Sequence, residues 1–244
     1  MIHLQLGIET SNLSKVYSKV TSLDTLNLNV PYGKCHLLLG PNGAGKTTCL
    51  KILAGLEKPT RGRAIVGGFD VKVQPLEVKR RIGYLPENPV LYDTLTSSEF
   101  LQFVGDIFKI PRDVREDRIR RYSDELEIGD YFDSFIGDLS KGETQRVLIT
   151  SILMREPKIF LLDEPFFSLD PIGSIKFRKI LKEKCIQGAT VLIATHMLEF
   201  AEKIGDSYTI IVKGKIKAQG TLDQSHITTN PLEKIFAESL GVNV

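Results

Sequence analysis

The sequence predicts an α/β protein with a mostly parallel sheet, an antiparallel β subdomain near the N-terminus and an inserted helical subdomain. Continuous apolar runs at 35–39, 159–162 and 190–194 are typical of strands buried on both faces of a parallel sheet. A helical segment at 174–184 separates the last two runs, and this strand–helix–strand order is characteristic of parallel α/β proteins. Residues 86–156 read as mainly helical, which predicts the insertion.

The N-terminal part mixes short strands with glycine turns, which favours an antiparallel meander. Residues 26–30 alternate apolar and polar side chains, as in a half-buried strand. The capping box Thr96–Glu99 predicts a helix start, and Pro111 is expected to stop that helix. The other expected elements are helices at 46–56, 140–154 and 230–240, short strands at 63–66 and around Val71, and a closing hairpin of 207–212 with 215–218.

The composition indicates one globular domain. Of 244 residues, 42% are apolar and 25% charged, so the chain has enough apolar side chains to form a core. A net charge of +2 argues against a nucleic-acid partner. Three separated cysteines without a C-x-x-C pair argue against a disulfide framework and a zinc site. We expect a core with its β subdomain at 1–85 and 157–220, a mainly helical subdomain at 86–156 and a helical tail at 221–244.

The residues from Gly40 to Thr47 match the pattern G-x-x-x-x-G-K-[ST] between a predicted strand and a predicted helix. Glycines allow consecutive backbone N–H groups to wrap a phosphate, and the following helix directs its positive end at the same anion. In this pattern Lys46 reaches the β- and γ-phosphates, and the Thr47 hydroxyl is a ligand of Mg²⁺. The spacing therefore predicts a nucleotide-binding P-loop NTPase core.

A second apolar strand, 159–162, ends in the carboxylates Asp163 and Glu164. Beside a phosphate loop, Asp163 is suited to hold Mg²⁺ and Glu164 to activate water as a general base. The segment 139–146 places Ser140 as the N-cap of a helix, with the N–H of Gly142 exposed as part of a second anion site. Taken alone, this segment is better explained as an ordinary capped helix.

Together these motifs resemble the ATP-binding cassette (ABC) ATPase family over nearly the whole chain. The loop 40–47 is similar to the family's phosphate loop, 139–143 to its Leu-Ser-Gly-Gly-Gln signature and 160–165 to its second carboxylate motif. Residues 168–170 resemble the loop that crosses the family's dimer, and His196 resembles its switch histidine.

The resemblance implies a Mg²⁺-dependent ATPase that converts ATP to ADP and phosphate. The implied catalytic residues are Glu164, His196 and Lys46. The implied metal ligands are Thr47, Glu87 and Asp163. The implied nucleotide-binding residues are Tyr17, which would stack on adenine, Gly40, Pro41, Asn42, Gly43, Ala44, Gly45, Lys46, Thr47 and Thr48, with Ser140 and Gly142 from a partner chain.

The sequence departs from the family pattern in three places. Glu87 stands where the family usually has glutamine, and Lys141 and Glu143 replace a glycine and a glutamine of the signature. Phe166 and Phe167 replace small polar residues before the loop that crosses the dimer. None of these changes removes the phosphate loop or the two carboxylates, so we expect an active enzyme with altered coupling.

The resemblance also implies a head-to-tail homodimer, or a dimer with a related ABC subunit, that closes on ATP and opens after hydrolysis. The similarity favours the ATPase subunit of an exporter-type membrane transporter, at the cytoplasmic face and attached through integral membrane permease subunits. Leu91 and Tyr92 are expected anchors for such a permease. The alternative is a soluble ABC ATPase that serves a partner such as an iron–sulfur assembly scaffold. A P-loop kinase or GTPase is disfavoured because the chain has no Asn-Lys-x-Asp motif.

Overall fold

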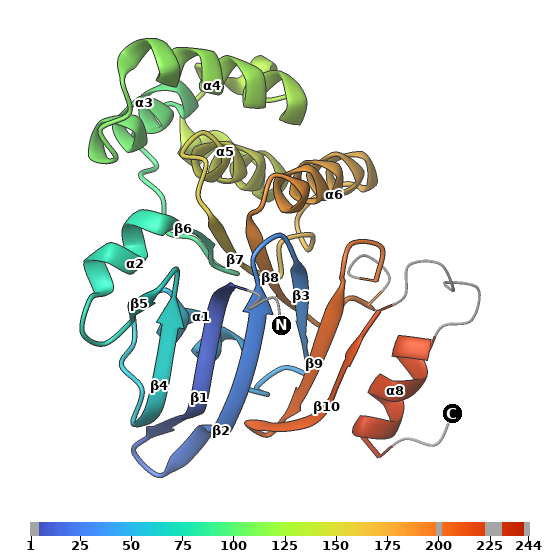
Figure 1. The fold of residues 1–244 in the computed structure, drawn as a ribbon. Coiled ribbons are helices and arrows are strands. Elements are labelled where there is room, and N and C mark those ends of the chain that lie inside the picture. Colours follow the sequence, from blue (N-terminus) through green and yellow to red (C-terminus); the bar gives the residue numbers. More distant parts are fainter. Residues whose placement is uncertain (1–4, 199–201, 223–230, 242–244) are drawn as a thin grey trace.

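The structure is a computed structural model that describes residues 5–198, 202–222 and 231–241, and it contains two sheets (Figure 1). The first has the order β2-β1-β4-β5, and its strand pairs are antiparallel. The second has the order β10-β9-β3-β8-β7-β6, and its pairs are parallel except for β9 with β10. Both the predicted β subdomain and the predicted mostly parallel sheet are confirmed. The strands are β1 (Leu6–Tyr17), β2 (Val20–Pro31), β3 (Cys35–Leu39), β4 (Arg61–Val66), β5 (Phe69–Asp70), β6 (Ile82–Leu85), β7 (Ile159–Asp163), β8 (Thr190–Thr195), β9 (Ser207–Val212) and β10 (Lys215–Thr221).

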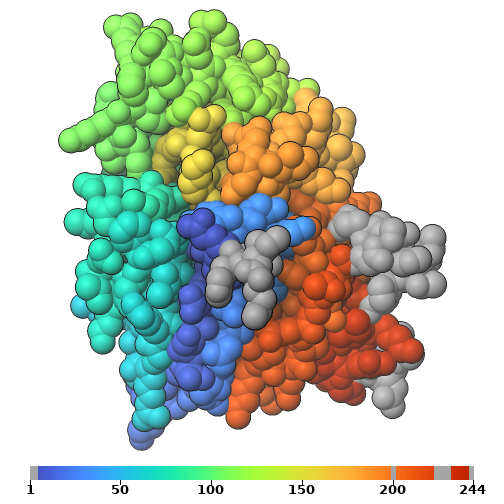
Figure 2. Space-filling model, in the orientation of Figure 1, coloured from blue at the N-terminus to red at the C-terminus, as the bar shows by residue number. Residues whose placement is uncertain are grey.

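Helices cover the parallel sheet and form the inserted subdomain. Figure 2 shows α3 and α4 as the upper part of the molecule, above the strands of both sheets. The expected insertion at 86–156 contains α3, α4 and α5, whereas α8 lies beside β10 near the C-terminus (Figure 1). The helices are α1 (Lys46–Leu53), α2 (Pro75–Arg81), α3 (Ser97–Ile107), α4 (Arg112–Leu126), α5 (Lys141–Leu153), α6 (Pro171–Ile186) and α8 (Pro231–Ser239).

The central strands β3, β7 and β8 are buried along their whole length. Because side chains alternate between the faces of a sheet, these strands supply two separate cores. Leu37 and Leu39 face the core shared with α3 to α6, whereas Leu38 faces the core shared with α1 and the antiparallel sheet. The parallel register pairs Leu39 with Thr195 and Asp163 with Ala194, so the three strands end at one level.

Several predicted boundaries are corrected by local backbone geometry. The helix at 46–56 ends at Leu53, because Gly55 adopts a left-handed conformation just beyond it. The helix that Pro111 was expected to stop ends earlier, at Ile107, where Lys109 is left-handed and the Ile110 N–H bonds back to the Gly105 carbonyl. Pro111 instead precedes the first turn of α4.

Two further differences lie at the ends of predicted elements. Val71 falls outside β5, because the Asp70 carboxylate accepts the N–H groups of Lys72 and Val73 and turns the chain. The last helix begins at Pro231, and Asn230 lies outside the described residues.

A buried histidine links β3 to β9. His36 Nδ1 lies 2.7 Å from the Ser207 hydroxyl and Nε2 lies 2.9 Å from the Thr209 hydroxyl. Burial lowers the pKa of His36 to about 4, since the charged imidazolium would be desolvated there. The ring is therefore neutral and structural in the folded protein.

We predict that His36 makes folding stability depend on pH between 4 and 6.5. The unfolded chain binds a proton on this histidine below about pH 6.5, whereas the folded chain does so only below about 4. Stability from this residue is thus full above pH 6.5 and is lost as the pH falls, by up to about 3 kcal/mol. Urea denaturation of wild type and His36→Asn across this range measures the difference. Parallel pH profiles for the two proteins would contradict the prediction.

Candidate active site

The loop between β3 and α1 has a backbone that requires its glycines. A Cβ on Gly40 would lie 2.3 Å from the Ile211 carbonyl oxygen. Gly45 has a φ of +106°, and a Cβ there would lie 2.4 Å from the Ser22 carbonyl oxygen. Gly43 also has positive φ, with open space around it. The loop therefore curls tightly at both ends and leaves its middle open, as a phosphate cradle requires.

This loop forms one wall of a cavity of about 370 Å³, and the predicted carboxylates lie in the lining too. The cavity thus brings together residues that are far apart in the sequence. The lining residues are Ser22, Asn42, Gly43, Ala44, Gly45, Lys46, Thr47, Thr48, Glu87, Asp163 and Glu164.

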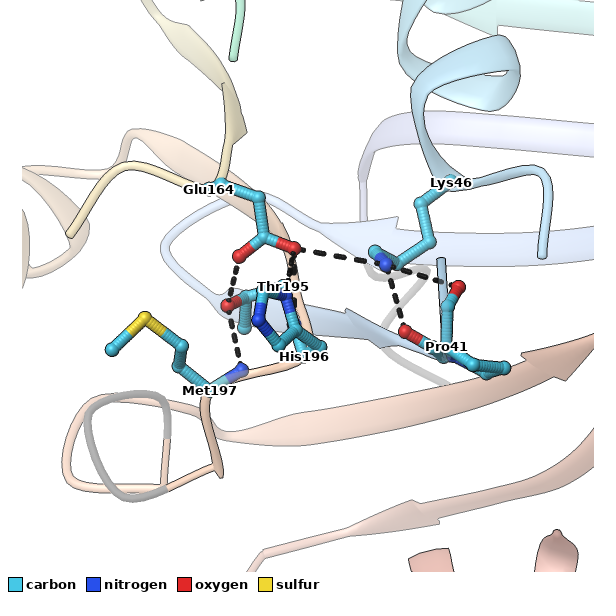
Figure 3. A network of polar contacts seen from close by, with 7 residues as sticks. Pro41, Lys46, Glu164, Thr195, His196 and Met197 are labelled. Carbon is cyan, nitrogen blue, oxygen red and sulfur yellow. Dashed lines mark hydrogen bonds and ion pairs between the residues drawn. The ribbon is translucent and has the colours of Figure 1, made fainter. Parts of the chain in front are cut away.

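Lys46 is folded back against its own loop. Its ammonium donates to the carbonyl oxygens of Gly40, at 2.7 Å, and Pro41, at 3.3 Å (Figure 3). It also lies 3.7 Å from Glu164 Oε1, and both side chains of this ion pair are buried. A lysine held by two neutral carbonyls and one carboxylate can exchange these contacts for stronger ones with phosphate oxygens.

Glu164 is held at the end of β7 by the end of β8. Its backbone has a φ of +47°, and its N–H donates to the Ala194 carbonyl, which continues the β7–β8 pairing by one residue. Oε2 accepts the Thr195 hydroxyl at 2.6 Å, and Oε1 accepts the His196 backbone N–H at 3.1 Å. His196 Nδ1 lies 2.7 Å from Oε1, so Nδ1 carries the proton of this hydrogen bond (Figure 3). The three predicted catalytic residues therefore form one network.

Asp163 is a buried carboxylate without a hydrogen-bond partner. Neither oxygen accepts a hydrogen bond of good geometry, although the nearby Thr47 hydroxyl lowers its pKa. Burial is the larger effect and, with Glu87 and Glu164 nearby, raises the pKa to about 6. A buried carboxylate of this kind fits a cation ligand, because a cation would supply the missing partner. The three predicted metal ligands, Thr47, Glu87 and Asp163, all line the cavity.

The side-chain carboxylates alone do not complete a metal site. Among the residues that the structure describes, no group of three or more His, Cys, Asp or Glu side chains could hold a metal ion. Oxygen ligands of other kinds, such as the Thr47 hydroxyl and the phosphates of a nucleotide, would have to join Asp163 and Glu87.

Two predicted nucleotide contacts lie at α5, outside this cavity. Ser140 caps α5 in a reciprocal box, in which its hydroxyl accepts the Glu143 N–H and its N–H donates to Glu143 Oε2. These bonds to Ser140 hold the pKa of Glu143 below its usual value. Gly142 packs closely on the loop after β7, since a Cβ would lie 2.9 Å from the Ser168 carbonyl oxygen. Neither Ser140 nor Gly142 lines the phosphate-loop cavity of its own chain.

Glu87 lies between two cavities. It lines the phosphate-loop cavity and also a second cavity of about 260 Å³ between Asn88, Lys141 and Phe167. Phe167 is 68% exposed there, whereas Phe166 is buried and packs against Phe177 at a centroid distance of 6.0 Å. The unusual aromatic pair thus divides into one core residue and one surface residue.

The sequence did not reveal one hydroxyl that lines the cavity and one that holds Glu164, and it left one prediction open. The Ser22 hydroxyl donates to Thr48 Oγ1 at 2.8 Å, and Thr195 holds Glu164. Thr195 could have been suspected, because it is the last residue of the strand that leads to His196. Tyr17 is partly exposed at the end of β1, with the Lys15 ammonium 4.6 Å from its ring centre, and it does not line the cavity. Its adenine contact stays a prediction.

A phosphate loop that faces two carboxylates at the carboxyl edge of a parallel sheet defines a nucleotide hydrolase of the P-loop class. Within this class, the family described as "ABC transporter" matches residues 23–167. The chain belongs to the ABC transporter family.

Relatives and solved structures agree with this assignment. The chain is 39% identical to an uncharacterized ABC transporter ATP-binding protein of Nostoc sp., over 89% of this chain and 67% of the relative. It is 36% identical to the ABC transporter ATP-binding protein NatA of Bacillus subtilis, over 91% of each chain. An ATP-binding subunit of an ABC transporter superposes with a TM-score of 0.89 at 32% identity, over 97% of this chain and all of that one.

A dimeric ATP-binding cassette in a post-hydrolysis state, bound to ADP and Pi, superposes with a TM-score of 0.81. The identity is 26%, over 88% of this chain and 99% of that one. The resemblance found in the sequence is thus confirmed. This chain is an ATP-binding and ATP-hydrolysing subunit of an ABC transporter, of a family whose cassettes dimerise.

Proposed function

We propose that two copies of this chain, or this chain and a related ABC subunit, bind each ATP between the phosphate loop of one chain and the start of α5 of the other. The observation that carries this proposal is the placement of Ser140 and Gly142, which do not line their own chain's phosphate-loop cavity. The N-terminus of α5 attracts anions through its free N–H groups and its dipole. A second chain in head-to-tail orientation would direct this helix end at the exposed side of the nucleotide.

On the phosphate-loop side, the residues of this chain bind and orient the nucleotide. The middle of the loop and the start of α1 supply backbone N–H groups for the phosphates. Lys46 exchanges the carbonyls of Gly40 and Pro41 for the β- and γ-phosphate oxygens, and this exchange separates it from Glu164.

The oxygens of Thr47, Glu87 and Asp163, which line one cavity, fit Mg²⁺ as ligands. The ion supplies charge neutralisation of the phosphates when it is bound. Burial raises the pKa of Asp163 to about 6 without a cation, so this carboxylate is mostly ionised at neutral pH and ready to bind one. Glu87 in place of the usual glutamine adds a harder oxygen ligand beside these two.

Glu164 is proposed as the general base. Its two oxygens contact Lys46, Thr195 and His196. Movement of Lys46 to the nucleotide leaves Oε1 with His196 as its neighbour, and Oε1 can then accept a proton from the attacking water. His196 keeps its Nδ1 proton on Glu164, so its Nε2 side is directed elsewhere and is available to the γ-phosphate.

A membrane permease is the proposed partner of the helical subdomain, which would place the chain on the cytoplasmic face of a membrane. Tyr92 is 57% exposed and meets Phe103 edge to face at 5.6 Å, with Val90 and Ile107 exposed as well. Such aromatic and aliphatic side chains are typical anchors of protein interfaces. Leu91, the other expected anchor, packs partly against the core. In the residues described, no helix has the length and hydropathy of a membrane span.

We predict that Glu164→Gln lowers ATP turnover by about 10²–10⁴-fold while ATP still binds, because the amide keeps the shape but cannot take the proton. ATP should then hold the variant as a dimer, measured by light scattering after gel filtration. Glu87→Gln is the matched control in the same cavity, and its turnover should stay within about tenfold of wild type. Turnover near wild type in Glu164→Gln would remove this residue from the role.

We also predict that Tyr92→Ser reduces recovery of an integral membrane protein with the tagged chain from native membranes, by about tenfold. Its isolated ATPase activity should stay within about twofold of wild type, because Tyr92 does not line the nucleotide cavity. Val73→Ser, another exposed apolar position, is the control. Recovery of soluble partners alone with the wild-type chain would favour the iron–sulfur scaffold alternative instead.

A further inference from the structure

A second polar pocket lies at the opposite end of the strands that carry the active site. It has a volume of about 290 Å³ and lies where β7 and β8 begin, whereas Glu164 and His196 follow the ends of these strands. Five residues of β7 span about 16 Å, so the two sites are separated by about the length of these strands. The pocket is lined by Arg118, Arg155, Glu156, Pro157, Lys158, Lys184, Gln187 and Ala189.

Four of these side chains are cationic and one is acidic. Arg118 and Lys184 both contact the Glu156 carboxylate. Arg118 donates a hydrogen bond to Oε2, and the Lys184 ammonium lies 3.7 Å from Oε1. Its backbone is left-handed, with a φ of +49°, where the chain turns from α5 into β7. One carboxylate balances one cation, so the lining keeps three positive charges in excess.

Lys184 is the most buried of the four cations. Only 6% of the residue is exposed, yet its ammonium, which has three donors, makes no hydrogen bond to any described residue. Its neighbours are Glu156, beyond hydrogen-bond distance, and the face of Tyr122, 5.5 Å from the ammonium. The side chain is mostly buried and lines the pocket, where an anion would supply the acceptors that the ammonium lacks.

Arg155 adds a second cation with unused donors. Its guanidinium stacks on Phe108 at 3.4 Å and donates to the Ile82 carbonyl at 2.8 Å. Its Nε is buried without a partner, and within the described part of the chain no carboxylate pairs with it. Burial lowers the pKa of Arg155 to about 10, which leaves it charged at neutral pH. The stacking on Phe108 restricts the orientation of this guanidinium, which belongs to the pocket lining.

We propose that this pocket binds a phosphate group. A guanidinium fork and a compact ammonium are the donors that phosphate oxygens prefer, and an excess of three positive charges suits a dianion better than a single carboxylate. Lys158 is exposed at the rim, where it adds attraction without a fixed contact. The phosphate has two sources, a free phosphate ion or the headgroup of an anionic lipid. The site is distinct from the nucleotide site, with which it shares no lining residue.

Two binding measurements on the full chain separate these sources. A non-hydrolysable ATP analogue with Mg²⁺ first fills the phosphate loop, and inorganic phosphate is then titrated by calorimetry. In parallel, sedimentation compares vesicles of phosphatidylcholine with vesicles that also contain phosphatidic acid. We expect one phosphate-dependent binding event in at least one arm. Arg118→Gln and Lys158→Glu should each weaken it by about tenfold, the first through loss of a charge-assisted contact and the second through reversal of a charge at the rim.

Lys182→Glu is the control of matched charge, because Lys182 is exposed on α6 but outside the pocket. It should bind within about twofold of wild type, and basal ATPase activity should be unchanged in Arg118→Gln and Lys158→Glu. Binding of free phosphate identifies the ion, whereas binding of phosphatidic acid vesicles alone identifies the headgroup. Absence of binding in both arms, or equal loss in Lys182→Glu, would overturn the proposal.

Discussion

The register of three parallel strands is the constraint on which the active site depends. β3, β7 and β8 are buried on both faces and end at one level, so the polar residues that follow them must meet there. Lys46 follows β3 after the glycine loop, Glu164 follows β7, and His196 follows β8. A one-residue slip of β8 would exchange the faces of Thr195 and His196 and break the network around Glu164. The two apolar cores fix this register, and they therefore also fix the relative positions of Lys46, Glu164 and His196.

The contact between Lys46 and Glu164 links phosphate binding to the proposed general base. Lys46, the proposed phosphate-binding residue, and Glu164, the proposed base, form a buried ion pair in which Nζ lies 3.7 Å from Oε1. Under our proposal, the phosphates of ATP compete for Lys46, and the carboxylate becomes free only when nucleotide is present. The left-handed backbone at Glu164 and the three hydrogen bonds from Thr195 and His196 hold the carboxylate near the position proposed for catalysis. Binding and activation of the base are thus linked through one lysine.

Much of this arrangement could be predicted from the sequence, because the apolar runs and the glycine loop are strong local patterns. The central strands and the phosphate-loop part of the cavity lining follow from them, whereas Ser22 does not. The helix caps at Thr96 and Ser140 follow from their own local sequence patterns. β1 was harder to predict: its register shifts and the left-handed Asn12 interrupt the alternation of buried and exposed residues. α2 is short and rich in charged residues, and β6 is a short strand at the edge of its sheet. Neither therefore shows a strong sequence pattern. The phosphate pocket depends on contacts between distant segments, which no local pattern reveals.

The capping box at Ser140 also explains one departure from the family pattern. Glu143 replaces the usual glutamine and completes the reciprocal cap of α5, which stabilises the helix start. The carboxylate remains beside the proposed site of the partner's γ-phosphate, so the same residue strengthens the fold and reduces the positive potential there. The Ser140 hydroxyl accepts the Glu143 N–H and keeps its own proton for a phosphate oxygen. The Ser140 hydroxyl can therefore cap α5 and contact the nucleotide at the same time.

The central claim, that ATP is bound between the phosphate loop of one chain and the α5 start of another, is tested most directly by cross-linking two single-cysteine variants. Asn42→Cys and Lys141→Cys place exposed thiols on the two half-sites, and the native cysteines are buried. Both are made in the Glu164→Gln background, mixed, and treated with a short bismaleimide. The account predicts a covalent dimer in the mixture, dependent on ATP, and little in either variant alone. A dimer formed equally well by Asn42→Cys alone, or no dimer with ATP, would contradict it.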